Sequence, residues 1–246
     1  MMGSAFRLIG RAIGEVQHDQ ALSDKLREIC MLIISAKRGK WRDKGGIESA
    51  DKEFATRRPQ IVSRDGGRCR FCNAKLEKMH VHHKDDDHSN NQPSNLMTTD
   101  ELCHAVNHVG LLGKAGHIVY LPSISQEDIS HLTRAIIVVI ARGGKDAEDA
   151  RQLARYLIAT FTEPVVATFG SDSPVHFGNA LLQLSDSSYN NRTSTMKDVR
   201  VLFDVAALSK GAGSIAKSLY PKAPDDIVGD WRRIADDIET RAGMQT

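Results

Sequence analysis

Residues 61–109 decide the fold of this chain, and they read IVSRDGGRCRFCNAKLEKMHVHHKDDDHSNNQPSNLMTTDELCHAVNHV. These 49 residues hold three of the four cysteines and six of the ten histidines found in the 246-residue chain. Thiolates and imidazoles are the ligands that zinc and similar cations prefer in proteins. This concentration predicts a small module built around metal ions.

The cysteines predict a structural zinc site. Cys69 and Cys72 stand in a C-x-x-C pattern, which places two thiolates on one tight turn facing a tetrahedral ion. A second such pair would complete the site, but the chain reads Asp100-Glu101-Leu102-Cys103, so Asp100 takes the place of the fourth thiolate. Carboxylates also bind zinc, and we therefore expect Zn²⁺ held by Cys69, Cys72, Asp100 and Cys103. The alternative is three buried free thiols in a reduced protein.

The histidines predict a second site with a different task. His104 and His108 are four residues apart and share one face of a helix. His82 and His83 are adjacent in an extended stretch, so their side chains point to opposite faces. One can bind a cation while the other faces a substrate, which is the division of labour that metal-assisted phosphodiester hydrolysis requires. The alternative is a histidine-rich loop that pairs with the carboxylates of residues 85–87.

This order of residues resembles the ββα-metal core of HNH nucleases. In that family a hairpin ends in the histidine doublet, a loop carries an asparagine, and a helix carries two further histidines. The resemblance implies that His83 is the general base and that His82, His104 and His108 hold a catalytic divalent cation. It also implies that Asn95 braces the loop.

A second resemblance covers most of the chain and is to the IcmJ/DotN family of type IVB secretion and conjugation systems. It starts at Leu32-Ile-Ile-Ser-Ala-Lys37 and includes the Cys69/Cys72 knuckle, Asn90-Asn91-x-x-Ser94-Asn95-Leu96, Val119-Tyr120-Leu121-Pro122 with Gln126, Phe169-Gly170, and Phe177-Gly178-x-x-Leu181-Leu182. The resemblance implies a cytoplasmic HNH-like adaptor held by the C-terminal tail of the coupling ATPase and recruited through it to the inner membrane. The family members compared lack the catalytic histidines that this chain has, so an active metal-dependent endonuclease acting on DNA is the alternative.

Composition is that of an ordinary soluble protein, with 41% hydrophobic and 26% charged residues. The longest apolar run, residues 135–141, is too short for membrane insertion. No apolar core of a signal peptide is present near the start, and few cysteines outside ligand spacing suit a reducing cytoplasm. Residues 37–78 carry 13 Lys or Arg against 6 Asp or Glu, which suits a phosphate backbone or an acidic protein tail.

We expect an α+β fold with an HNH-like, zinc-knuckle module followed by an α-helical C-terminal region. The expected segments are an N-terminal extension (1–30), the zinc-knuckle domain (31–122), a helical region packed on it (123–184), and a linker with C-terminal helices (185–246). Expected elements are a helix over 54–62, a strand over 75–83, a helix over 101–109, a strand over 117–121, and helices that begin at Ser125 and later cover 196–208 and 227–238. Partner docking is expected at Lys37–Lys44 and on the apolar faces of the last helices.

Overall fold

The computed structural model describes residues 32–38, 47–122 and 124–219. The predicted extension over 1–30, most of the basic stretch Lys37–Lys44, and the predicted helix over 227–238 lie outside the described residues. Within the described part of the chain, no helix combines the length and apolar character needed to cross a membrane. Helices and two small antiparallel sheets make up the fold, in agreement with the expected α+β class.

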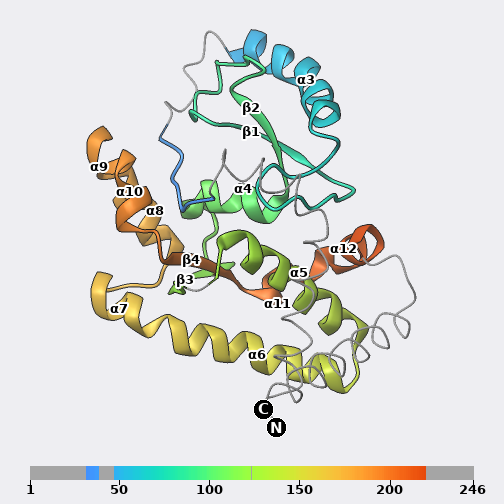
Figure 1. Cartoon of the computed structure of the whole chain (residues 1–246), viewed down its shortest axis with the longest axis vertical. Coiled ribbons are helices and arrows are strands. Elements are labelled where there is room, and N and C mark those ends of the chain that lie inside the picture. The colour runs from blue at the N-terminus through green and yellow to red at the C-terminus, as the bar shows by residue number, and fades with distance from the viewer. Residues whose placement is uncertain (1–31, 39–46, 123, 220–246) are drawn as a thin grey trace, which may run out of the picture.

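The first part of the molecule is a hairpin covered by a long helix, at the top of Figure 1. Helix α3 (Ile47–Arg64) precedes the paired strands β1 (His80–His83) and β2 (Leu96–Thr99), and α4 (Glu101–Asn107) follows them. The pairing is antiparallel and sets His82 opposite Met97. Ile61 of α3 is buried against Val81 and Leu96 of the hairpin. This contact explains why α3 continues through Pro59, beyond the short helix expected over 54–62.

A second sheet joins distant parts of the sequence. Strand β3 (Gly116–Tyr120) follows the 3₁₀ turn η2 (Val109–Leu111) and pairs antiparallel with β4 (Val199–Phe203). The expected helix over 196–208 is therefore wrong, and only α11 (Val205–Leu208) at its end is helical. Val201 and Leu202 of β4 belong to hydrophobic clusters on opposite faces of the sheet, and this two-sided burial favours a strand. The pairing crosses the expected boundaries near residues 122 and 185, and that division stays a prediction.

The helical part is largely as expected. Helix α5 (Gln126–Arg142) begins at Ser125, whose hydroxyl accepts a hydrogen bond from the Asp128 N–H, as the capping pattern predicts. It is followed by α6 (Lys145–Phe161), α7 (Glu163–Phe169) and α8 (Pro174–Gln183). The expected linker over 185–195 instead contains the short helices α9 (Asp186–Asn190) and α10 (Arg192–Thr195). The turn η3 (Ser209–Gly211) and α12 (Ala212–Leu219) complete the described chain.

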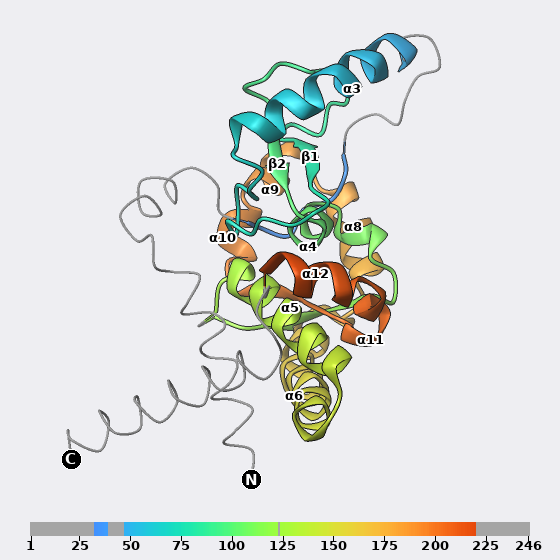
Figure 2. The same cartoon turned by 90° about the vertical axis from the view of Figure 1, so that its right-hand side faces the viewer.

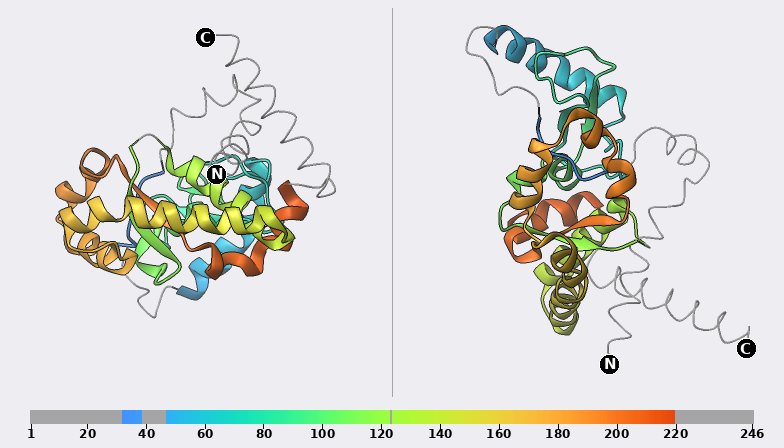
Figure 3. Two further views of the ribbon diagram at one scale, coloured as in Figure 1. Left: turned by 90° about the horizontal axis from the view of Figure 1, so that it is seen from below. Right: turned by 90° about the vertical axis from the view of Figure 1, so that its left-hand side faces the viewer.

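The layers are stacked along the long axis of the molecule. Below the hairpin and α4 lie α5 and the β3–β4 sheet, and α6 runs across the opposite end (Figures 1 and 3). Helix α12 lies beside α5 in Figure 2. The side-chain amide of Gln126 on α5 donates to Val201 O at 3.0 Å and accepts from Val201 N at 2.7 Å. The outer edge of β4 is thus closed by a side chain that mimics a strand.

Glycines allow α8 to pack tightly on η2. A methyl group added at Gly178 would overlap the backbone of Gly110, with the Gly110 nitrogen at 2.7 Å. Only glycine fits at this contact, which joins α8 to the turn directly after the histidines of α4.

Replacing Gly178 with Ala should therefore lower the free energy of unfolding by about 1–3 kcal/mol, because overpacking forces the two backbones apart. Urea unfolding measures the change. Gly213→Ala is the matched control, since a methyl group there meets nothing within 4 Å. A Gly178→Ala variant as stable as the control variant would contradict the close contact.

Candidate metal centres

The structure brings together the four residues of the predicted zinc site. The ligand atoms of Cys69, Cys72, Asp100 and Cys103 lie within 4.8 Å of one another, and all four side chains are buried. The knuckle turn is closed by hydrogen bonds from Asn73 N to Cys69 O and from Cys69 N to Ala74 O, both 2.9 Å. Three thiols and a carboxylate that converge inside a protein form a donor set suited to zinc.

Asp100 has two tasks, one for each carboxylate oxygen. Its Oδ1 caps α4 by accepting from the N–H groups of Leu102 at 2.9 Å and Cys103 at 3.2 Å, and it also accepts from the Arg134 guanidinium. Its Oδ2 accepts from Cys72 Sγ at 3.0 Å and faces the thiols. Burial alone would raise the pKa of this carboxyl group, but Arg134 and the thiol hydrogen bonds hold it well below its usual range. Asp100 is therefore ionised and can offer Oδ2 to a cation.

Side chains of α5 surround this cluster. His131 Nε2 donates to Cys72 O at 2.8 Å, Cys103 Sγ lies 3.8 Å from Ser130 Oγ, and Arg134 donates to both Cys72 and Asp100. All three α5 side chains are buried. The signal that could have revealed them is the spacing of Ser130, His131 and Arg134, which places three polar side chains on one face of a helix that is otherwise rich in apolar residues. A buried guanidinium also requires an anionic partner.

The histidine cluster is the second group of metal-binding type. His82 of β1 meets His104 of α4 and His108 at its C-terminal end, with ligand nitrogens within 4.8 Å of one another. The closest pair of rings, His104 and His108, has centroids 4.6 Å apart. Burial is the main cause that lowers the pKa to about 3 for His82, about 3 for His104 and about 4 for His108. The three rings are neutral at pH 7, as metal ligands must be.

The structure places His83 apart from this group. Its ring stacks between Phe54 and His88, with centroid distances of 5.0 and 4.8 Å, and the residue is only 4% exposed. Asn91 donates its own amide to Ala50 O at 2.9 Å, so its Oδ1 is the acceptor for His83 Nε2 at 3.0 Å. This arrangement puts the ring proton on Nε2 and leaves the lone pair on Nδ1.

Asn95 lies in the loop between β1 and β2 and forms hydrogen bonds within it. It accepts from Asp85 N at 3.2 Å and donates to Asp85 Oδ1 at 2.8 Å and to Asn90 O at 2.9 Å. These contacts tie both ends of the loop that carries His88.

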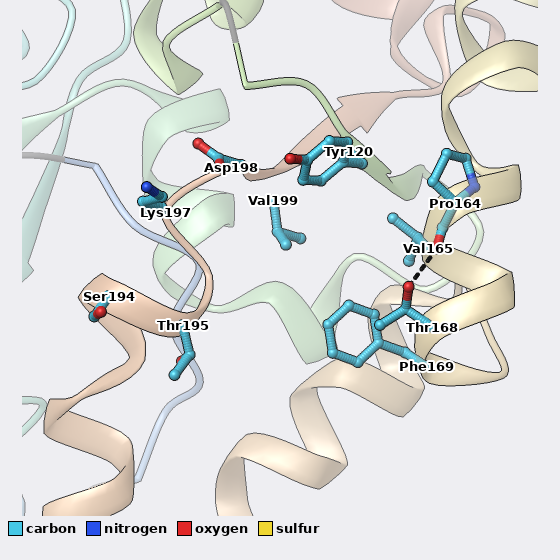
Figure 4. A pocket seen from close by; sticks show the side chains of 10 residues that line it. All are labelled: Tyr120, Pro164, Val165, Thr168, Phe169, Ser194, Thr195, Lys197, Asp198 and Val199. Carbon is cyan, nitrogen blue, oxygen red and sulfur yellow. Dashed lines mark hydrogen bonds between the residues drawn. The ribbon is translucent and has the colours of Figure 1, made fainter.

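A cleft of about 370 Å³ lies between α7 and the segment that leads into β4, next to Tyr120 at the end of β3. In Figure 4 its walls are α7 on one side, with Val165 and Phe169, and the chain from Ser194 to Val199 on the other, and Tyr120 of β3 stands between them. Phe169 and Tyr120 are 52% and 43% exposed, so both rings offer apolar surface to solvent beside the cleft. Both residues belong to stretches that carry the resemblance to the IcmJ/DotN family.

The chain is 26% identical over 216 residues to the type 4 apparatus protein DotN of Legionella pneumophila. The match covers 84% of this chain and 99% of DotN. It therefore spans the hairpin module, both candidate metal centres and the helical part alike. No family model matches the chain.

The metal-free protein should lose stability as the pH falls from 7.5 to 6. The pKa values of His82, His104 and His108 lie below the unfolded value of 6.5. Below that value the unfolded chain takes up protons that the folded chain does not, so the free energy of unfolding decreases. The three residues together contribute about 2 kcal/mol over this range. Urea unfolding at pH 7.5, 6.5 and 6 measures the slope.

The control for this slope is a variant with all three histidines changed to Gln, which should show a clearly smaller slope. Burial also lowers the pKa values of His80 and His131, and both residues remain in the two proteins and act in the same direction. Asp86, with its pKa raised to about 6 mainly by burial, acts in the opposite direction near pH 6. Both proteins should therefore carry Asp86→Asn. An equal slope in both proteins would show that these histidines are not buried in neutral form.

Added Ni²⁺ or Zn²⁺ should raise the melting temperature of wild-type protein that already holds zinc at the cysteine cluster, because a ligand that binds only the folded state stabilises it by mass action. His104→Ala should abolish this gain while leaving the zinc content of the cysteine cluster unchanged. His176→Ala, on the exposed surface of α8, is the control and should keep the gain. An undiminished gain in His104→Ala would mean that the histidines do not share a cation.

Proposed function

We propose that this chain is a cytoplasmic, zinc-stabilised adaptor with an HNH-like core in a type IVB secretion or conjugation machine. The observation that carries the proposal is the match to DotN along the whole length of that protein, a component of a type 4 apparatus by its name. A nuclease core alone would not account for similarity that continues through β4 and the helices packed on it. In this proposal Zn²⁺ is held by Cys69, Cys72, Asp100 and Cys103.

The partner in this proposal is the C-terminal tail of the coupling ATPase, through which the chain is recruited to the inner membrane. The tail is an extended segment that orders on binding and places an apolar side chain in the cleft beside Phe169. Such a cavity, rimmed by Lys197 and Asp198 and open to solvent, is the kind of pocket in which a buried anchor dominates affinity.

The second candidate function is a metal-dependent HNH endonuclease acting on DNA. The observation that favours it is the convergence of His82, His104 and His108, because a divalent cation held there would stabilise charge on a phosphodiester. His83, oriented by Asn91 with its lone pair on Nδ1, would be the general base, and Asn95 would brace the loop. Burial of His83 between Phe54 and His88 weighs against this function, since a base must reach the attacking water.

We expect the purified chain to bind a peptide of the ATPase tail, and Phe169→Asp to weaken binding about tenfold or more, because a charge in the cleft removes an apolar contact. Leu111→Asp, at a residue 75% exposed on η2, is the control and should bind like the wild type. Affinity should change only modestly between low and moderate salt. Binding to duplex DNA would fall steeply over the same range, because it depends on counterion release.

Two outcomes count against this proposal. If the Phe169→Asp variant binds the tail as tightly as the wild type does, the cleft is not the docking site. Absence of tail binding, together with cleavage of supercoiled plasmid DNA that is lost in His83→Ala, would replace the adaptor by the nuclease.

A further inference from the structure

Arg134 is the feature of the cysteine–aspartate cluster that a metal-site motif does not require. Among the described residues it is the single Lys or Arg that is buried, and Asp100 is the single buried Asp or Glu. Both side chains are almost fully excluded from solvent, at 1% and 0% exposure. A buried guanidinium remains charged, so it has to be compensated by the charges around it.

The charges of the cluster explain why such a cation is there. Three thiolates and one carboxylate bring four negative charges to a doubly charged zinc ion, and two remain uncompensated. The Arg134 guanidinium donates to Asp100 Oδ1 and lies 3.5 Å from Cys72 Sγ, so it neutralises one of the two within contact distance of two ligands. In a buried site such a charge acts strongly, because little solvent screens it.

Arg134 also fixes the orientation of the carboxylate. Its contact and the two N–H groups at the start of α4 all use Oδ1 of Asp100, which leaves Oδ2 directed at the thiols. Arg134 is held in turn by His131, whose Nδ1 lies 3.5 Å from the guanidinium and whose Nε2 donates to the knuckle backbone at Cys72 O. Partners behind the ligands of a metal site set both ligand orientation and affinity.

We propose that Arg134 is a positioning residue for Zn²⁺ at Cys69, Cys72, Asp100 and Cys103: it supplies the charge and the contact that let an aspartate act as the fourth ligand. The proposal rests on the zinc of the proposed function but not on the adaptor role. A consequence is that zinc bound by the knuckle and α4 also holds α5, which carries Arg134. The metal then links the hairpin module to the helical part instead of stabilising the hairpin alone.

The test is a double-mutant cycle on zinc affinity, measured by chelator competition. The wild type should bind one Zn²⁺ at this site, with about 10- to 100-fold weaker binding in Arg134→Met. In an Asp100→Asn background the ligands carry one negative charge less and Oδ1 no longer needs a cation. One uncompensated charge remains on the thiolates, which Arg134 still contacts at Cys72, so Arg134→Met should weaken binding several-fold less than it does with Asp100 present. A purely structural arginine would not produce this coupling.

Co²⁺ in place of zinc gives an independent measurement, because its visible spectrum reports tetrahedral coordination and its near-ultraviolet bands report thiolate ligands. We expect a tetrahedral spectrum in the wild type and a weakened or distorted one in Arg134→Met. The spectrum should recover in Arg134→Lys. If Arg134→Met does not fold, Arg134→Lys is the variant compared with the wild type. Equal losses of affinity in both backgrounds, or unchanged affinity and spectrum in Arg134→Met and Arg134→Lys, would overturn the role of Arg134. A wild type that binds no zinc at this cluster would overturn the site itself, whereas tail binding reports on the adaptor separately.

Discussion

The contact between Arg134 and Asp100 joins three parts of the chain at one buried point: the cysteine knuckle, the start of α4, and the middle of α5. Removing two charged groups from water is costly, and their attraction offsets that cost only when the remaining donors and acceptors are satisfied. Asp100 meets this condition through the N–H groups of Leu102 and Cys103 and the thiol of Cys72. Arg134 meets it in part, through Asp100, Cys72 and His131, while its Nε is buried without a hydrogen-bond partner. The position of α5 relative to the knuckle is therefore set by charge and hydrogen bonding as well as by apolar packing.

Elements whose signals are local could be predicted from the sequence, and elements that depend on distant partners could not. The start of α5 is encoded in Ser125 and Asp128, which are neighbours, and the structure has the expected cap. Residues 199–203 form a strand because they pair with Gly116–Tyr120, about eighty residues earlier in the chain. This pairing buries both faces of β4. Its apolar residues read equally well as a helical stripe when that partner is unknown.

The same distinction holds for the candidate sites. Spacing paired Cys69 with Cys72 and His104 with His108, since C-x-x-C and a histidine pair four residues apart constrain geometry within a single turn. The choice of His82 as the third histidine ligand came from the resemblance to HNH nucleases. Arg134 is 34 residues from Asp100 and 62 from Cys72, and no short pattern connects them. The adjacent pair of histidines also did not indicate that His83 is buried by other side chains. Phe54 on α3 and His88 in the following loop enclose His83, and both contacts depend on how α3 and the loop fold over the hairpin.

The two requirements of a metal-dependent hydrolase are separated in this chain. A cation site needs several neutral imidazoles facing one point, and His82, His104 and His108 meet that need because burial keeps them unprotonated. Hydrolysis also needs a base whose lone pair reaches water at the cation, whereas His83 stacks with Phe54 and His88 and is only 4% exposed. Exposing it would require His88 to move, with the loop that Asn95 ties to Asp85 and Asn90. Hydrogen bonds that hold this loop beside His83 therefore favour the proposed adaptor over the proposed nuclease.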